Sequence, residues 1–252
     1  WIPKAYTGSY GTNGFHLTYQ DDTVSEGFNT VTYTGNGATQ SISGIGFSPD
    51  LVWIKRRDGA YAHTLVDTVR GSGNWLESNA TAAEQSGGAP SSFDSDGFTL
   101  TSWGQVNLNS SSFVGWCWDA GSSTVSNTDG TITSSVRANP AYGFSIVSYT
   151  GNNSNATVGH GLGAAPDFII TKTRSIVNAW NCYHASLGAG YRIFLSGTNA
   201  AAASSTIWNN TSPTSAVFSV GDANTNGSGT TMLAYCFSEI AGYSKFGSYT
   251  GN

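Results

Sequence analysis

Short hydrophobic runs with a two-residue alternation recur along the whole chain, each bounded by Gly, Asn, Asp or Pro. This pattern predicts β-strands separated by tight turns. The two segments with a helical pattern, Ser78–Ser86 and Asn199–Ser204, are too short to be stable helices by themselves. The sequence therefore predicts an all-β fold, with its clearest strands at Phe28–Tyr33, Leu51–Arg56, Phe98–Trp103, Phe113–Trp118, Phe144–Tyr149, Phe168–Lys172, Val217–Val220 and Met232–Phe237.

The chain contains an internal repeat. Gly27–Asn36 matches Gly143–Asn152 at a shift of 116 residues, and the strand around Cys117 matches the strand around Cys236 at a shift of 119. A shift that changes so little indicates two copies of one domain that differ by small loop insertions. We expect an N-terminal segment at residues 1–26, a first copy at 27–138 and a second copy at 139–252, with the start of a third copy at 244–252.

Each copy is predicted to be a β-sandwich of jelly-roll or lectin-like type. In Val114–Trp118 the bulky side chains share one face of the strand, and Gly115 and Cys117 share the other. The second copy keeps this split around Cys236. Such a strand is typical of the centre of a sandwich, where both faces are covered. The polar stretch Gly121–Pro140 has the composition of a linker between the two copies.

Composition and charge exclude several classes of partner. Only 10% of the residues are charged, the net charge is -5, and Lys55–Arg57 is the one basic cluster, so no nucleic-acid partner is expected. No apolar run approaches the length of a membrane-spanning helix, so no membrane insertion is expected. Buried free thiols are the main interpretation of Cys117, Cys182 and Cys236, and a Cys117–Cys236 bridge stays open.

Catalytic groups are not evident in the sequence. Asp50 and Asp167 occupy the same Pro-Asp turn in each copy, which the fold explains more simply than catalysis does. His63 and His184 lie at roughly corresponding places, and no Gly-x-Ser-x-Gly motif precedes a helix. We therefore expect no catalytic residue, no cofactor and no enzyme activity. A glycosidase with two facing carboxylates is kept as a hypothesis, because such chemistry leaves little trace in a sequence.

Asp222, Asn224 and Asn226 have the spacing of the first half of a calcium loop. The acidic residue that would close such a loop is missing, since Leu233 stands in its place. These three residues are therefore only a weak calcium candidate, and a turn rich in Asn is the favoured interpretation. No metal is otherwise expected.

Aromatic residues are the better candidates for a binding function. Strand patterns assign Trp53, Trp116 and Trp118 to the core. Four other tryptophans lie near predicted turns, where an indole ring could stack on the apolar face of a sugar ring. The ligand-binding candidates are therefore Trp75, Trp103, Trp180 and Trp208.

The repeat carries long motifs that resemble a known group of sequences. Gly27–Asn36, the run Pro49–Lys55 and Trp116-Cys117-Trp118 resemble an uncharacterised tandem-repeat β-domain family in virion proteins of marine tailed bacteriophages. The second copy is similar to the following repeat in such proteins. Residues 1–26 resemble the end of a lectin-like domain that often precedes these repeats.

This resemblance implies a virion structural protein, either a tail fibre or a decoration of the capsid surface. It implies an extracellular location at the virion surface and other virion subunits as partners. It also implies a homo-oligomer, with a trimer among the candidate states, and a host-surface glycan as a further partner. The alternative is a carbohydrate-binding module of a secreted hydrolase, which would present an exposed row of aromatic residues.

Overall fold

A computed structural model describes residues 27–88 and 90–251, and over these residues it confirms the all-β class. We define residues 27–120 as the N-terminal half and 121–251 as the C-terminal half. The N-terminal half contains β1 Phe28–Thr34, β2 Gln40–Ser43, β3 Leu51–Arg56, β4 Thr64–Asp67, β5 Ser92–Asp94, β6 Gly97–Leu100, α1 Gly104–Asn107 and β7 Ser112–Trp118. The C-terminal half contains β8 Val125–Asn127, β9 Ser134–Asn139, β10 Phe144–Thr150, β11 Ala156–Gly159, β12 Phe168–Thr173, β13 Asn181–His184, β14 Tyr191–Phe194, β15 Ala202–Ala203, β16 Val217–Val220, α2 Ala223–Asn226 and β17 Thr231–Phe237.

A strand is present at each of the eight predicted places, although the one predicted at Phe98–Trp103 ends at Leu100, and the two predicted helical segments are not helical. Residues 78–86 form turns and one isolated bridge, and residues 199–204 include β15. Six to nine residues with a helical pattern do not suffice to nucleate a helix against competing strand contacts. The helices α1 and α2 have four residues each, and no helix in the described ranges is long and apolar enough to cross a membrane.

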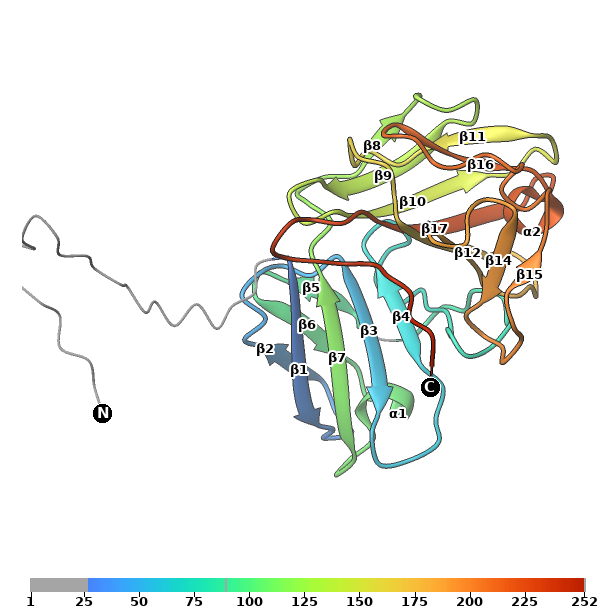
Figure 1. The fold of residues 1–252 in the computed structure, drawn as a ribbon. Helices are drawn as coiled ribbons and strands as arrows, with labels where there is room; N and C mark the ends of the chain where they lie inside the picture. The colour runs from blue at the N-terminus through green and yellow to red at the C-terminus, as the bar shows by residue number, and fades with distance from the viewer. Residues whose placement is uncertain (1–26, 89, 252) are drawn as a thin grey trace, which may run out of the picture.

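The same strand order occurs in both halves. The N-terminal half has a four-stranded sheet in the order β1-β7-β3-β4, and the order β10-β17-β12-β13 lies within an eight-stranded sheet of the C-terminal half. The register agrees as well, since Phe28 pairs with Trp118 and Phe144 pairs with Phe237. A smaller antiparallel sheet accompanies each one, β2-β6-β5 and β11-β16 respectively. The repeat in the sequence is therefore a repeat of strand topology (Figure 1).

The expected linker Gly121–Pro140 contains two strands. β8 and β9 pair with each other, and β9 pairs with β10, so both extend the sheet of the C-terminal half. The expected boundary at residue 138 falls inside β9, and the change from one sheet to the other occurs between β7 and β8. The composition did not indicate these strands because few of their side chains are buried. The edge strand β8 has no buried residue, and in β9, which lies between β8 and β10, only Ser134 and Val136 are buried.

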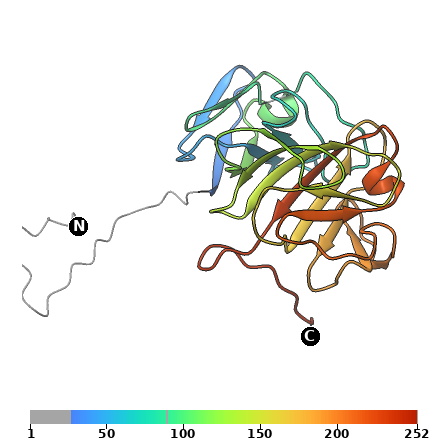
Figure 2. The ribbon, with the colours of Figure 1, turned by 90° about the horizontal axis from the view of Figure 1, so that it is seen from above.

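Each large sheet has one face in the core of its own half. In β7, Phe113 and Cys117 pack with Phe98 of β6. In β17, Met232 and Cys236 pack with Phe218 of β16. The opposite faces carry the bulky residues, and many of these meet in a third cluster that both halves share. In Figure 1 the strands of the two large sheets run across one another where the halves meet, and Figure 2 gives the view from above.

The three cysteines are free and buried, so the Cys117–Cys236 bridge is not formed. Cys117 and Cys236 point away from the contact between the halves, into separate cores. Burial raises the pKa of Cys117 and of Cys182 to about 12. None of these thiols is therefore ionised near neutral pH.

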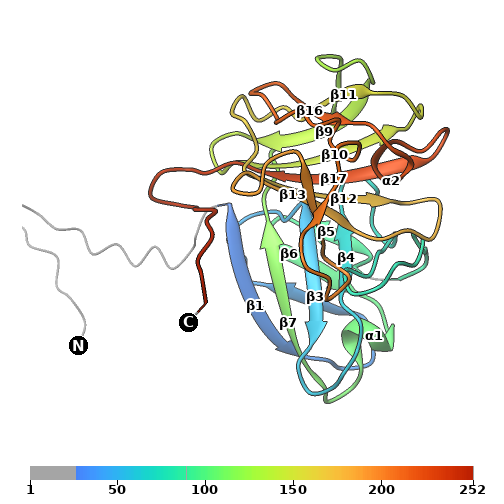
Figure 3. The ribbon, with the colours of Figure 1, turned by 45° about the vertical axis from the view of Figure 1, so that its right-hand side comes forward.

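The C-terminal stretch after β17 forms a turn closed by a bridge between Ile240 and Ser244, and residues 245–251 are not in a sheet. Figure 3 shows this stretch beside the junction of the two halves. Tyr249 is 95% exposed, whereas its sequence counterparts Tyr33 and Tyr149 each donate a hydrogen bond to a backbone carbonyl in the short helix of their half. The expected start of a third copy at 244–252 thus forms no strand over its described residues.

Candidate functional site

One face of the N-terminal sheet carries a cluster of half-buried aromatic side chains, which we call the aromatic surface. It consists of Phe28 on β1, Trp53 on β3, Trp116 and Trp118 on β7, and His63 immediately before β4. These residues share a face because side chains alternate along a strand and because Trp53 pairs directly with Trp116 across β3 and β7. The alternate positions on β7 point into the core, which leaves the bulky positions on the outer face.

The rings of the aromatic surface hold one another in place. The Nε1 of Trp53 donates a hydrogen bond to Nδ1 of His63 at 2.8 Å, and the His63 ring stacks on Trp116 with a centroid distance of 6.5 Å. Trp118 lies 6.4 Å from Trp53 and 4.9 Å from Phe28. Because Nδ1 of His63 accepts a hydrogen bond, the proton of the neutral ring is assigned to Nε2. The rings therefore form an ordered surface rather than a set of independent side chains.

The pKa of His63 is lowered from its ordinary value. Desolvation of the ring is the main cause, and the positive charge of Lys55 adds to it. Both effects disfavour the imidazolium form. The imidazole of His63 is therefore neutral at neutral pH, and the aromatic surface gains a positive charge only in acid.

A pocket of about 590 Å³ adjoins the aromatic surface at the junction of the two halves, and we call it the junction pocket. Phe28, Trp53 and Trp118 line it from the N-terminal half. The C-terminal half and the C-terminal stretch supply the remaining walls, namely Tyr142, Gly143, Phe144, Phe168, Ile170, Leu195, Phe237, Ser238, Gly242, Tyr243, Ser244 and Phe246.

The C-terminal stretch closes one side of the junction pocket through ring contacts. Phe246 lies 6.1 Å from Phe168 and 6.0 Å from Phe237, and Tyr243 lies 5.4 Å from Tyr142, measured between ring centroids. The lining residues include no Asp, Glu, His, Lys or Arg. The pocket can therefore bind an apolar or flat group by stacking and burial, and it presents no side-chain pair suited to general acid-base chemistry.

The structure reverses the predicted roles of the tryptophans. Three of the four ligand-binding candidates are buried, with exposures of 8% for Trp75, 0% for Trp180 and 1% for Trp208. The fourth, Trp103, is half-buried, and its ring lies 4.7 Å from that of Trp75. The three buried rings cannot form an exposed stacking surface, and Trp103 alone does not form the predicted set. Proximity to a turn was a poor guide because those turns fold back on the sheets; Trp208, for example, donates to the carbonyl of Tyr191.

Asp222 and Asn226 of the weak calcium candidate both have structural roles. Asp222 caps the N-terminus of α2 by accepting from the backbone N–H of Asn224 at 2.9 Å. The side chain of Asn226 is fully buried and bonds Asn152 and the carbonyl of Ser154. Within the described residues no group of three or more His, Cys, Asp and Glu side chains converges to hold a metal.

Asn107 of the N-terminal half makes the matching contacts to Asn36 and Ala38. Asn107 and Asn226 therefore act as clamps that hold the turns after β1 and β10, respectively. The side-chain oxygens of Asp222 and Asn226 accept backbone N–H groups, and this capping role accounts for a spacing that resembles a calcium loop.

The strand register corrects the expected match between the two histidines. Because Ile54 pairs with Thr64 and Thr171 pairs with Asn181, His63 corresponds to Trp180. His184, which pairs with Phe168, corresponds to Asp67, which pairs with Leu51. The two histidines thus have unrelated environments.

The aspartates of both Pro-Asp turns make contacts with segments distant in sequence. Asp50 accepts from the backbone N–H of Ala120 and from the hydroxyl of Thr68, and it forms an ion pair with Arg137 at 2.6 Å. Asp167 accepts from the backbone N–H of Glu239 at 2.8 Å. These aspartates stabilise the ends of the strands that follow them, as the repeat suggested.

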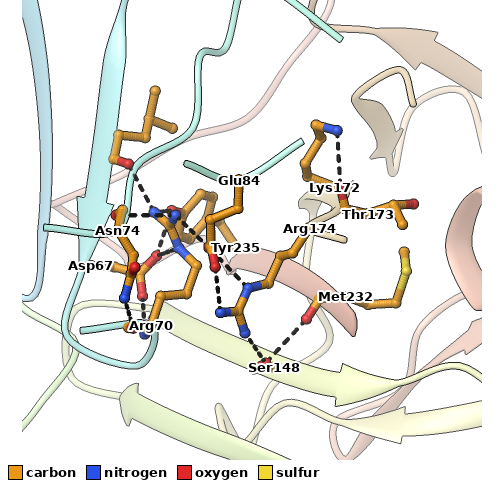
Figure 4. A network of polar contacts seen from close by, with 11 residues as sticks. Asp67, Arg70, Asn74, Glu84, Ser148, Lys172, Thr173, Arg174, Met232 and Tyr235 are labelled. Atoms are coloured by element: carbon orange, nitrogen blue, oxygen red, sulfur yellow. Dashed lines mark hydrogen bonds and ion pairs between the residues drawn. The ribbon is translucent and has the colours of Figure 1, made fainter. Parts of the chain in front are cut away.

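A buried ionic network joins the two halves, and the sequence analysis did not find it (Figure 4). Arg70 forms ion pairs with Asp67 at 2.5 Å and with Glu84 at 3.0 Å. The hydroxyl of Tyr235 donates to Asp67 at 2.8 Å and accepts from Arg70 at 3.3 Å. Arg174 binds the same Glu84 carboxylate at 2.7 Å. The network links the segment after β4 to β17 and to the end of β12.

The charged state of this network is favoured despite its burial. Desolvation lowers the pKa of Arg70, but the carboxylates of Asp67 and Glu84 outweigh it, so that the pKa is raised overall. Burial raises the pKa of Tyr235 well above its ordinary value, so its hydroxyl stays protonated and can donate. The only sequence signal was that Arg70 and Glu84 are charged residues in a chain with few charges.

Comparison with known proteins identifies a family but no function. Residues 23–252 match a family described as a domain of unknown function, DUF7483. No curated protein and no solved structure matches the chain.

Proposed function

The chain belongs to the DUF7483 family, and we propose that it is a non-catalytic binding module of a tailed-bacteriophage virion surface, in a tail fibre or a capsid decoration. The observation that carries the binding part of this proposal is the aromatic surface with its adjoining junction pocket. Tryptophan is enriched among the residues that contribute most to binding at protein interfaces. The virion part rests on the sequence motifs of the repeat.

The surroundings of the aromatic surface favour a contact surface over an active site. The pocket lining is aromatic and aliphatic, with hydroxyl groups as its polar side chains. The exposed Thr30, Thr32 and Thr34 lie beside the rings on β1, where they supply polar groups at the rim. An apolar centre with a polar rim is the usual anatomy of a binding interface. Host receptors and neighbouring virion subunits are the partners that such a module would contact.

Mass spectrometry of purified virus particles tests the virion part of the proposal. Peptides from this chain should be present in particles of the virus whose genome encodes it, in stoichiometric amounts relative to other structural proteins. Matched particles from a strain that lacks the gene provide the control. Absence of the peptides from the purified particles, together with their presence in the surrounding lysate, would overturn the proposal.

Carbohydrate binding in the junction pocket is a second candidate function. It is favoured by the pairing of flat rings with phenol groups, because Tyr142 and Tyr243 lie at the same pocket as Trp118 and Phe246. Aromatic faces can cover the apolar face of a sugar while hydroxyls bind its rim. A glycan array with the whole chain tests this idea. Binding that Trp118→Ala abolishes and Val125→Ala retains supports it, and an array with no bound glycan contradicts it.

A further inference from the structure

The junction pocket contains a buried hydroxyl group that is not paired. Ser238 lines the pocket and is 1% exposed, and its Oγ has no hydrogen-bond partner among the described residues. A buried hydroxyl in this state is unfavourable, so a ligand that pairs with it gains affinity. The hydroxyl therefore marks the place in the pocket where a polar group of a ligand would lie.

The counterpart of Ser238 in the N-terminal half is fully paired. Asp119 follows β7 as Ser238 follows β17. One carboxylate oxygen of Asp119 accepts from the backbone N–H of Gly121 at 2.6 Å, and the other accepts from the side chain of Asn139 at 3.0 Å. The unpaired hydroxyl is therefore specific to the junction pocket and does not come from the strand end that the two halves share.

A glycine lies beside this hydroxyl. Gly143 also lines the pocket, and a Cβ placed on it would lie 2.9 Å from Oγ of Ser238 and 2.9 Å from the side chain of Ile240. The same Cβ would lie 2.3 Å from the carbonyl of Ser238, so the close approach of the two backbones also requires the glycine. Any larger residue at this position would crowd the hydroxyl.

The walls of the pocket favour an uncharged ligand with flat rings. The lining includes no charged side chain, and a buried charge without a partner is costly. The rings of Phe168, Phe237 and Phe246 lie 6.0 to 6.1 Å from one another, and Trp118 lies 6.4 Å from Phe237. Such rings contact other aromatic rings through their faces and edges. The volume of about 590 Å³ is within the range of pockets that hold drug-sized ligands.

The pocket fits a ligand with one polar group better than a ligand with many. Each hydroxyl of a sugar ring needs a partner when it is buried. Of the two serines in the lining, Ser244 already accepts from the backbone N–H of Ile240 and donates to the carbonyl of Ser238. The Oγ of Ser238 is left to pair with a single group of the ligand.

Polar contacts of the C-terminal stretch hold the Phe246 wall of the pocket in place. The carboxylate of Glu239 accepts from Nζ of Lys245 and from the backbone N–H of Phe246, both at 2.9 Å. These contacts keep the ring of Phe246 beside Phe168 and Phe237. The aromatic wall opposite the N-terminal half is therefore complete without any strand pairing of the stretch.

We propose that the junction pocket binds a free, uncharged aromatic compound of about two fused rings with a single hydroxyl group, which pairs with Oγ of Ser238 while the rings pack between the two halves and Phe246. The proposal rests on the binding role proposed for the junction pocket. It assigns to that pocket a class of ligand other than the carbohydrate considered above.

Ligand-observed NMR titrations with the whole chain test the class of ligand. The probes are 2-naphthol, naphthalene, 2-naphthoate and methyl α-D-glucopyranoside. The chain should bind 2-naphthol about fivefold more tightly than naphthalene, because only the former has a hydroxyl for Ser238. It should bind 2-naphthoate and the glucoside at least about tenfold more weakly than 2-naphthol, because a charge or several hydroxyls would be buried without partners.

Two variants with matched controls test the residues. Ser238→Ala should weaken 2-naphthol binding about fivefold and leave naphthalene binding unchanged, which also shows that the pocket is intact. Ser145→Ala is its control, because Ser145 is buried and pairs with Cys236 on the core face of the sheet. Phe246→Ala should weaken the binding of both compounds about fivefold. Tyr249→Ala, at a position 95% exposed in the same stretch, should change neither.

Several results would overturn the proposal. They are no binding of 2-naphthol up to its solubility limit, equal 2-naphthol binding by the wild type and Ser238→Ala, and tighter binding of the glucoside than of 2-naphthol. N-acetyltyrosinamide, a phenol on a peptide backbone, should bind more weakly than 2-naphthol, and tighter binding would instead assign the pocket to a side chain of a protein partner. The content of virus particles does not depend on these affinities, so failure here can be told apart from failure of the virion proposal.

Discussion

Removal of the Arg70 guanidinium should destabilise the whole chain more than removal of any exposed charge. The variant Arg70→Met keeps much of the side-chain volume but leaves the buried carboxylate of Asp67 without its partner. Breaking a buried ion pair in this way typically costs about 3 to 5 kcal/mol. Asp67 keeps two other donors, the backbone N–H of Arg70 and the hydroxyl of Tyr235. We therefore expect a loss at the low end, about 3 kcal/mol in the free energy of unfolding.

Equilibrium urea denaturation followed by tryptophan fluorescence measures this loss. Lys245→Met provides the control, because Lys245 is 83% exposed in its ion pair with Glu239, and its midpoint should match the wild-type midpoint within error. The double variant Asp67→Leu with Arg70→Met removes both charges and should recover part of the lost stability. An Arg70→Met midpoint equal to that of the wild type would refute the reasoning, because it would mean that the network does not hold the halves together.

Three further predictions follow from the site and its surroundings. Asn226→Ala removes the clamp on the turn after β10 and should lower the free energy of unfolding, measured by urea denaturation, by about 2 kcal/mol. Asn107→Ala should have a similar effect. A free energy of unfolding equal to that of the wild type within error would show that the clamp is dispensable. The pKa of His63 is lower in the folded than in the unfolded chain, so the contribution of His63 to the free energy of unfolding is present above pH 6.5 and is lost as the pH falls. His63→Gln should therefore reduce the slope of unfolding free energy against pH between about pH 7.5 and about pH 5. An unchanged slope would contradict this. Cys117, Cys182 and Cys236 are all buried, so the chain should react with a thiol reagent such as Ellman's reagent only after unfolding. Rapid labelling of the folded chain would contradict the structure.

The sequence predicted the strands and their repetition well, because alternating hydrophobic positions and Gly-rich turns are local signals. Leu51–Arg56, for example, matches β3 at both ends. The strands β8 and β9 escaped notice because they are polar, and because their place at the end of the sheet depends on the pairing of β9 with β10 rather than on their own composition. Local pattern therefore predicts the central strands, while the extent of a sheet depends on contacts that are distant in sequence.

The candidate site was the least predictable part. Alternation along β7 showed that Trp116 and Trp118 share one face with Val114, but it could not show whether a second layer covers that face. In the C-terminal half residues 67–84 cover the matching positions, through Arg70 on Tyr235 and Glu77 on Trp180, whereas Trp116 and His63 of the N-terminal half are only half-buried. Burial of an outer face is a property of how the halves pack, so two nearly identical strand patterns have different exposures.

Virus particles whose chain carries Trp116→Ala test the binding role of the aromatic surface most directly. Val125→Ala, at a position 55% exposed on β8, is the matched control. The Trp116→Ala particles should contain less of the chain, or should adsorb to host cells more slowly, because the aromatic surface contacts a neighbouring subunit or a host receptor. Trp116→Ala particles that contain the chain in the control amount and adsorb at the control rate would contradict the account.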